Sequence, residues 1–279
     1  MQSNNYDLQS LFRLDGQVAV VTGGGGVLCS VMGQALAAAG AQVALVDLSA
    51  EAAERAAKSI VDNGGKAIGV SASVLQKESL QAALDQVLNQ FGRIDILING
   101  AGGNQSRATT SPDLSFFDLD LSAVERVFGL NFTGTFLASQ VIGKYMAEQK
   151  RGNILNIASM NSMRPLTRIP AYSAAKAAVV NFTQWMAVHM AQEYSPEIRV
   201  NALAPGFFLT EQNRFLMTDK ETGQPTPRGK KVLDHTPMNR LGQPEDLLGA
   251  MLWLVSPASS FVTGITVPVD GGFSAYSGV

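Results

Sequence analysis

Three residues in the second half of the chain have the types and spacing of a proton-transfer site. Tyr172 and Lys176 are four positions apart in a segment with helical character, so phenol and ammonium are expected side by side on one helix face. A free tyrosine has a pKa of about 10, too high for efficient proton exchange at neutral pH, and a nearby positive charge lowers it. Ser159 closes an apolar strand segment, and its hydroxyl could orient a carbonyl oxygen. Together they predict chemistry on a carbonyl group.

A glycine-rich segment, Thr22 to Cys29, lies between the first expected strand and the first expected helix. Glycines let the backbone approach a pyrophosphate, whose charge a helix N-terminus then stabilises. The pattern G-x-G-x-x-G is nevertheless incomplete, because its last position falls on Leu28 or Cys29, depending on where it starts. The segment therefore indicates a nucleotide site, with a plain glycine-rich turn as the alternative.

Asp47 strengthens the nucleotide interpretation. It ends the second expected strand, where a carboxylate can bind the adenosine ribose hydroxyls. The same charge would repel a 2′-phosphate, and Leu48 supplies no arginine to accommodate one. A helix N-cap is the alternative role, but Ser49 could serve it equally well. Turn and carboxylate together predict NAD rather than NADP.

The elements that must position these residues form a regular alternation. Short apolar segments without polar alternation are typical of strands buried on both faces of a parallel sheet. Alternating with Ala- and Leu-rich segments, they predict an α/β single-domain Rossmann fold: a doubly wound, seven-stranded parallel sheet with helices on both faces. The expected strands are 18–21, 42–46, 67–70, 94–98, 153–157, 198–203 and 265–269, and the expected helices are 27–39, 50–62, 77–91, 124–150, 171–193 and 244–255.

Two irregular stretches, 102–120 and 207–240, interrupt this alternation. Both would emerge at the carboxyl ends of strands, where doubly wound sheets bind ligands. We expect 207–240 to act as a substrate lid, with a tolerated surface loop as the alternative. Residues 1–13 are expected to form an N-terminal arm, and 1–279 a single domain.

Composition excludes several classes of function. Apolar residues make up 46% of the chain, charged residues 16%, and the net charge is -2, which gives no electrostatic footprint for nucleic acid or an anionic membrane. One cysteine excludes an intrachain disulfide, and with two histidines it leaves no expected metal centre beyond a carboxylate-only magnesium site. The polar first residues lack a signal-peptide pattern, and no apolar run approaches the roughly 20 residues of a membrane span. We expect a cytoplasmic protein.

From about residue 14 onward, these motifs together resemble the short-chain dehydrogenase/reductase family. The family's Asn-Asn-Ala-Gly strand end corresponds to Asn99-Gly100-Ala101-Gly102, and its catalytic asparagine falls on Asn131. The resemblance implies that Tyr172 is the general acid/base and that Lys176 holds the nicotinamide ribose and lowers the tyrosine pKa. It implies that Ser159 polarises the carbonyl and that Asn131 fixes a water in a proton relay. It also implies a homotetramer built through two long helices.

The cofactor contacts follow from the same resemblance. They are Gly23, Gly25, Gly26, Val27, Leu28, Asp47, Leu48, Ser73, Val74, Asn99, Ala101, Gly102, Tyr172, Lys176, Pro205, Gly206, Phe208 and Thr210. Four positions depart from the family pattern. Val27 and Cys29 replace glycines, so helix–strand packing must adapt to their side chains. Gly100 replaces the second asparagine, and Ser73 stands where the family often has an aspartate touching adenine.

A finer resemblance, at residues 98–110 and 267–278, is to the D-mannonate oxidoreductase (fructuronate reductase) branch. It implies reduction of a keto-hexuronate, D-fructuronate, to D-mannonate with NADH. Polar residues expected at the site mouth fit a charged, hydroxylated substrate, because arginine pairs with carboxylates. The expected substrate contacts are Asn104, Arg107, Ser159, Asn161, Arg164 and Tyr172, with Gln105 and Arg168 nearby.

Three other functions remain open from the sequence. One is a different sugar, polyol or ketogluconate dehydrogenase of the same family. Reduction of a 3-oxoacyl carrier is disfavoured, since it suits NADP and a basic docking patch. A nucleotide-binding regulator without catalysis is disfavoured by the intact Ser159, Tyr172 and Lys176.

Overall fold

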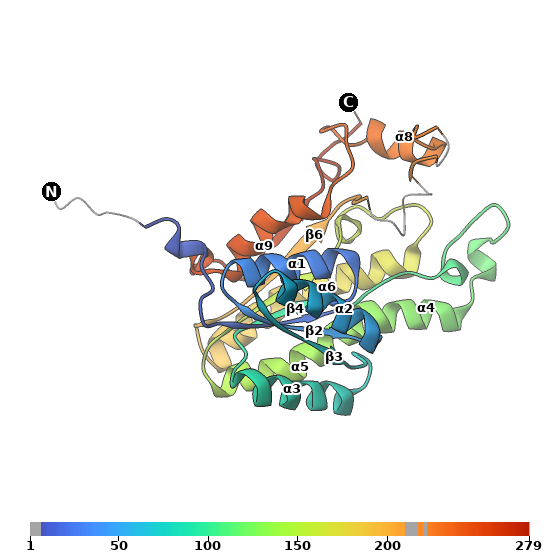
Figure 1. Cartoon of the computed structure of the whole chain (residues 1–279). Coiled ribbons are helices and arrows are strands. Elements are labelled where there is room, and N and C mark those ends of the chain that lie inside the picture. The colour runs from blue at the N-terminus through green and yellow to red at the C-terminus, as the bar shows by residue number, and fades with distance from the viewer. Residues whose placement is uncertain (1–6, 210–216, 220–221, 279) are drawn as a thin grey trace.

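A single parallel sheet forms the centre of the molecule. The computed structural model describes residues 7–209, 217–219 and 222–278, and within them the sheet has seven strands in the order β3-β2-β1-β4-β5-β6-β7 (Figure 1). This confirms the expected single-domain, doubly wound α/β fold. The strands are β1 Val18–Thr22, β2 Gln42–Asp47, β3 Lys66–Ser71, β4 Ile96–Asn99, β5 Gly152–Ile157, β6 Ile198–Pro205 and β7 Thr266–Val269.

Helices cover both faces of this sheet, as Figure 1 shows for α1 and α9 on one side and α3 and α5 on the other. One apolar cluster joins the sheet to α1, α2 and α9, and a second joins it to α3, α5 and α6. The helices are α1 Val27–Ala38, α2 Ala50–Asp62, α3 Lys77–Phe91, α4 Leu121–Phe128, α5 Gly134–Glu148, α6 Pro170–Glu193, α8 Pro227–Asp234 and α9 Leu248–Val255.

Strand β1 shows why the strand segments carry no polar alternation. All five of its residues are buried. Val18 and Val20 belong to the cluster with α3, α5 and α6, whereas Ala19 and Val21 belong to the cluster with α1, α2 and α9. Successive side chains point to opposite faces of a strand, so a strand covered on both sides must be apolar throughout.

The long helix expected over 124–150 was wrong as a single element. Instead α4 and α5 are joined by a wide π-helical turn, Gly129–Thr133. The side chain of Asn131 donates to the Val127 carbonyl at 2.8 Å and so competes for the acceptor that a regular helix would use. The expected 244–255 helix likewise begins as a 3₁₀ turn, Pro244–Leu247, before α9.

Both irregular stretches follow strands at the carboxyl edge of the sheet. Residues 102–120 follow β4 and contain the short 3₁₀ turns Ser106–Ala108 and Phe116–Asp118. In the 207–240 stretch the structure describes 207–209, 217–219 and 222–240, including α8. Figure 1 shows α8 standing away from the sheet, near the C-terminus. Thr210, an expected cofactor contact, lies outside the described residues.

Candidate active site

The site is built where the strand order reverses, between β1 and β4. The last residue of β1, Thr22, ties the two strand ends together. Its buried hydroxyl accepts hydrogen bonds from the backbone N–H groups of Gly100 and Ala101 at 3.1 and 3.3 Å. Doubly wound sheets bind their ligands in the crevice at this reversal point.

The glycine turn after β1 is shaped by close backbone contacts. Gly23 has a φ of 67°, and a Cβ there would lie 2.9 Å from Ala101 Cα. A Cβ on Gly24 would lie 2.9 Å from Leu45 Cα. Helix α1 begins directly afterwards, and its N-cap Gly26 offers no side-chain cap. The turn and the free N–H groups at the start of α1 therefore fit the pyrophosphate of a dinucleotide.

Asp47 is held against this turn from the end of β2. One carboxylate oxygen accepts from Gly25 N at 3.1 Å, and the other accepts from Ser49 N at 3.0 Å. Ser49, not Asp47, caps α2 by accepting from Ala52 N. The competing role of Asp47 as the helix cap is thus taken by its neighbour. Leu48 beside it is 76% exposed.

The structure brings Ser159, Tyr172 and Lys176 together. Ser159 follows β5, Tyr172 is the third residue of α6, and the two side chains share a hydrogen bond. Lys176 is one turn further along α6 and 3% exposed. Its ammonium donates to the Ile157 carbonyl at 2.6 Å and lies 5.7 Å from the centroid of the Tyr172 ring. One strand end and one helix turn thus fix all three groups.

The pKa shifts in this cluster differ from the simple expectation that lysine lowers the tyrosine pKa. Burial raises the pKa of Tyr172 above its ordinary value, and the hydrogen bond with Ser159 opposes this. Burial also lowers the pKa of Lys176 to about 8. The Lys176 ammonium donates to a backbone carbonyl rather than to the phenol, and the shift of the Tyr172 pKa comes from burial and from Ser159. The raised value keeps Tyr172 protonated at neutral pH, as a proton donor must be.

Asn131 is completely buried in the π-helical turn. Its amide oxygen accepts from Gly103 N at 3.2 Å, and its amide nitrogen donates to the carbonyls of Gly103 and Val127. A Cβ on Gly102 would lie 2.6 Å from the Asn131 oxygen and 3.3 Å from the Lys176 ammonium. Asn131 therefore holds the segment after β4 close to Lys176. π-Turns of this kind are common at functional sites.

Asn99, an expected cofactor contact, has its side chain turned into the protein. Its amide nitrogen donates to Ser139 Oγ and to Asn156 Oδ1, both at 2.8 Å. Asn156 in turn donates to Thr183 of α6 at 2.9 Å. This buried chain links β4, β5 and α6, so the Asn99 side chain positions the strand ends that carry the site.

Two departures from the family pattern compensate for each other. A Cβ added to Gly100 would overlap the sulfur of Cys29. Cys29 is 6% exposed, and burial raises its thiol pKa to about 12. The thiol therefore occupies the space that a side chain at position 100 would need, and it is neutral at physiological pH.

The remaining expected cofactor contacts lie along the same edge. Val74 is buried, and Ser73 Oγ accepts from Leu75 N at 3.3 Å. Gly206, after β6, must be small because a Cβ there would lie 2.6 Å from Asp270 Cα. Phe208 is 6% exposed and packs on Gly242.

The expected substrate contacts divide into two groups. Asn161 is buried close to Ser159, whose hydroxyl accepts from its backbone N–H. By contrast, Arg107 pairs with Asp120 at 2.8 Å, and Asn104 donates to Thr109. Arg164 is exposed. The structure therefore gathers Ser159, Asn161 and Tyr172, whereas Arg107 and Asn104 are held by neighbours within their own stretch.

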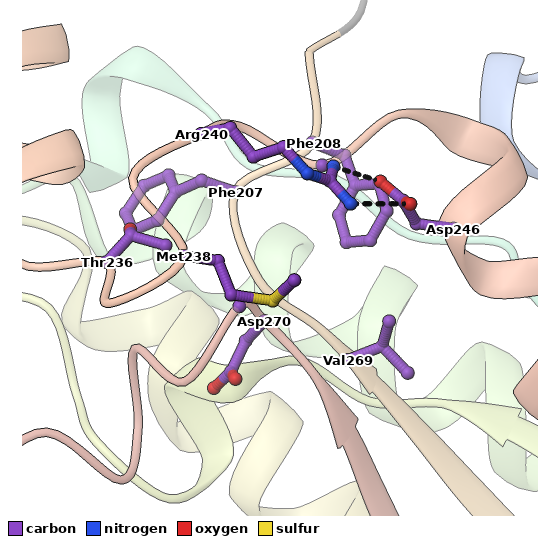
Figure 2. Close-up of a pocket in the computed structure, with 10 residues that line it drawn as sticks. Phe207, Phe208, Thr236, Met238, Arg240, Asp246, Val269 and Asp270 are labelled. Carbon is purple, nitrogen blue, oxygen red and sulfur yellow. Dashed lines mark hydrogen bonds and ion pairs between the residues drawn. The ribbon is translucent and has the colours of Figure 1, made fainter.

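A pocket lies beyond the end of β6, apart from the cluster of Ser159, Tyr172 and Lys176 (Figure 2). Phe207 and Phe208 line it with Arg240, whose guanidinium forms two hydrogen bonds with Asp246 at 2.5 and 2.8 Å. Asp270 lies on its floor and accepts from the backbone N–H groups of Gly272 and Ser274. Since its charged groups already have protein partners, this pocket is organised for structure rather than for binding an ion.

Sequence reasoning missed three polar residues of α8 and the segment after it that face the loop before α6: Arg228, Lys231 and His235. Their signal was the i, i+3 spacing of Arg228 and Lys231. Among the described residues, no three His, Cys, Asp or Glu side chains gather as a metal ion requires. Over the same residues, no helix has the length and apolar character needed to cross a bilayer.

Known proteins similar to this chain agree on one family. A family model described as enoyl-(acyl carrier protein) reductase matches residues 28–274. An uncharacterized oxidoreductase of Bacillus subtilis, UxuB, is 51% identical over 96% of this chain and 98% of its own length.

Two solved structures extend the similarity to the fold. A provisionally assigned D-mannonate oxidoreductase from Haemophilus influenzae, with bound NAD, is 48% identical with a TM-score of 0.90, covering 98% of this chain and 100% of that one. A gluconate 5-dehydrogenase from Burkholderia cenocepacia, in complex with NADP and tartrate, is 33% identical with a TM-score of 0.85, covering 96% and 99%. The chain belongs to the short-chain dehydrogenase/reductase family and is an oxidoreductase.

Proposed function

We propose that this enzyme reduces the keto group of D-fructuronate to give D-mannonate, with NADH as the cofactor. The observation that carries the proposal is the buried cluster of Ser159, Tyr172 and Lys176 beside a dinucleotide-shaped turn that holds Asp47. The similarity to the Haemophilus influenzae protein supports the substrate, as does the resemblance at residues 98–110 and 267–278.

In this proposal the residues of the cluster have separate tasks. Ser159 donates a hydrogen bond to the keto oxygen and orients it. Tyr172 gives its phenolic proton to the same oxygen as the alcohol forms. Lys176, fixed by the Ile157 carbonyl, holds a positive charge near the phenol and binds the nicotinamide ribose. The reduced nicotinamide supplies the hydride. Asn131 fixes a water in the path that returns a proton to Tyr172.

The preference for NADH over NADPH rests on Asp47. Its carboxylate is fixed by hydrogen bonds from Gly25 N and Ser49 N. We expect the adenosine ribose to bind on this side of the turn, next to the carboxylate. A 2′-phosphate placed there would meet a fixed negative charge, with Leu48 rather than a cation beside it. Bound NAD in one similar structure and NADP in another show that the family uses both, so this chain's own carboxylate is the argument.

A second candidate substrate is 5-keto-D-gluconate. A 5-keto-D-gluconate 5-reductase of Escherichia coli is 33% identical over 95% of this chain. Both candidates are hydroxylated keto acids that differ in where the ketone lies. Initial rates of NADH oxidation with D-fructuronate, 5-keto-D-gluconate and D-fructose separate them. We expect D-fructuronate to have the highest kcat/KM; a clear preference for 5-keto-D-gluconate would replace the proposed substrate.

We further propose that the enzyme is a cytoplasmic homotetramer and that 207–240 covers the bound substrate. An aromatic surface on α5 and α6 supports the assembly. Trp185 is 56% exposed there, and Phe136 and Tyr194 are 38% and 44% exposed. Exposed apolar patches of this kind mark subunit interfaces. The molar mass in solution tests the proposal: Trp185→Glu should give smaller species, and Val61→Glu on α2 should not.

A further inference from the structure

A cavity of about 500 Å³ lies between the loop before α6 and helix α8. Besides Thr167, its polar lining consists of basic residues: Arg168 comes from the loop, Arg228 and Lys231 come from α8, and His235 follows that helix. Phe207 and Phe273 supply aromatic walls. Among the residues that the structure describes, no acidic one lines it. We call this cavity the cationic pocket. Its volume is within the range of roughly 300–1,000 Å³ that small-molecule sites have.

Among the described residues the cations of this pocket have no acidic partner, whereas the nearby Lys230 and Arg240 do. Within the part of the chain that the structure describes, no ion pair involves Arg168, Arg228 or Lys231. Lys230, next to Lys231, pairs with Asp234 at 3.2 Å, and Arg240 pairs with Asp246. Like charges gathered without a counter-charge repel one another, and a bound anion removes that repulsion.

Helix α8 is fixed in an orientation in which Arg228 and Lys231 line the pocket. Thr226 caps its N-terminus by accepting from Gly229 N at 3.0 Å, and Pro227 occupies the first turn. Gly229 is packed so tightly that a Cβ would overlap the Met217 carbonyl oxygen. Val232 is buried on the same side of the helix. Arg228 and Lys231 are three positions apart and therefore neighbours on the helix surface.

The walls of the pocket come from segments that are close in sequence to the proton-transfer site. Ile169, which lines it, caps α6, and Tyr172 is the third residue of that helix. The loop that carries Arg168 is tied down, because its carbonyl accepts from Thr110 N at 2.9 Å. Phe207, on the opposite wall, directly follows Gly206, an expected nicotinamide contact. On this ground we expect a substrate with its ketone at Ser159 and Tyr172 to extend its chain toward the pocket.

We propose that Arg168, Arg228 and Lys231 bind the carboxylate of the substrate and make the enzyme selective for keto acids over neutral ketoses. This assignment rests on the proposed function and replaces Arg107 and Arg164 as the carboxylate ligands. Arg107 already forms an ion pair with Asp120, so its positive charge is neutralised within the protein. The three pocket cations come from two separate elements and converge on one space. Arginine binds a carboxylate through two parallel hydrogen bonds, which also fixes the direction of the sugar chain.

The test compares Arg168→Gln, Arg228→Gln and Lys231→Gln with Lys230→Gln. The last is a matched control, because it removes the same charge from the same helix at a position that is already paired. We expect each pocket variant to lose about 10–100-fold in kcat/KM for D-fructuronate, the size of one charged hydrogen bond. The loss should appear mainly in KM, since the carboxylate is bound equally before and during reaction. Lys230→Gln should change kcat/KM by less than about twofold.

Two further readouts distinguish this site from general damage. The dissociation constant for NADH and the slow reduction of D-fructose should be the same in all four variants and the parent enzyme. If the pocket variants lose no more activity than Lys230→Gln, or lose D-fructose and D-fructuronate equally, the carboxylate assignment is wrong while the proposed function stands. Better turnover of D-fructose 6-phosphate than of D-fructuronate also overturns it.

Failure of the proposed function has a different signature. If the parent enzyme does not reduce D-fructuronate but reduces 5-keto-D-gluconate, the proposed substrate is wrong. Kinetics of the same four variants with 5-keto-D-gluconate then test whether the pocket binds the carboxylate. If no keto acid is reduced, both proposals are overturned.

Discussion

Two regions of the molecule meet at the substrate, and they differ in how their charges are satisfied. At the carboxyl ends of β1 to β5, polar groups are held by other protein groups: the buried Lys176 by the Ile157 carbonyl, the buried Asn131 by Gly103, and the half-buried Asp47 by Gly25. In the cationic pocket, Arg228 and Lys231 are exposed and form no ion pair with any residue that the structure describes. The first arrangement suits the proposed proton transfer, and the second suits the proposed recognition of the substrate carboxylate. Catalysis and selectivity are thus separable by mutation.

The largest effect on turnover is expected in the buried cluster of Ser159, Tyr172 and Lys176. Tyr172→Phe removes the proton donor and keeps the ring, so turnover should fall by about 10²–10⁴-fold. Binding of NADH should remain within about twofold, because the Asp47 turn is untouched. Steady-state kinetics and a fluorescence titration with NADH measure the two quantities. Parent-like kcat in this variant would show that the tyrosine is not the proton donor.

A smaller effect, on the choice between NADH and NADPH, is expected at Asp47. Asp47→Asn keeps an oxygen that can accept from Gly25 N while removing the negative charge. We expect the ratio of kcat/KM for NADH to that for NADPH to fall by about 10–100-fold, which corresponds to roughly 1.5–3 kcal/mol for a charge-assisted hydrogen bond. Kinetics with both cofactors measure the ratio. An unchanged ratio would remove Asp47 from cofactor discrimination.

Lys176 adds a pH dependence to the same region. Burial lowers its pKa to about 8, so the ammonium is present below that pH and is lost above it. Tyr172, with its raised pKa, stays protonated through the same range. The kcat/KM for ketone reduction should therefore fall as pH rises above about 8. In Lys176→Arg the charge persists to far higher pH, so any activity left should lose this fall. An identical fall in that variant would assign it to another group.

The smallest expected effect concerns packing and leaves the chemistry in place. Gly100→Asn restores the family residue against Cys29 and should destabilise the protein by about 1–3 kcal/mol through overpacking. Combining it with Cys29→Gly should recover part of that loss. Chemical denaturation of the parent, both single variants and the double variant measures the coupling. Additive effects would show that the two departures are independent.

The same contrast explains which features could be predicted from the sequence. The seven strands, the glycine turn and the cluster of Ser159, Tyr172 and Lys176 depend on local periodicity and short spacings, and the structure places them as expected. The π-helical turn could not be predicted, because it depends on the Asn131 side chain reaching Val127 and Gly103.

The cationic pocket was missed for a similar reason. Arg168 and Arg228 are 60 positions apart, and only the fold brings their elements together. Arg107 was expected to face the substrate, but its partner Asp120 is thirteen residues away and equally invisible to local pattern. Pairing of charges is decided by tertiary structure, so sequence could supply the candidates but not choose among them.

The proposed reaction is the reduction of a keto sugar acid with NADH. Its most direct test is kcat/KM for D-fructuronate with NADH, measured beside D-fructuronate with NADPH and D-fructose with NADH, with D-mannonate identified as the product. We expect kcat/KM for D-fructuronate with NADH to exceed both other values by at least about tenfold, the size of one lost charged interaction. Equal rates with D-fructose, or higher efficiency with NADPH, would contradict it.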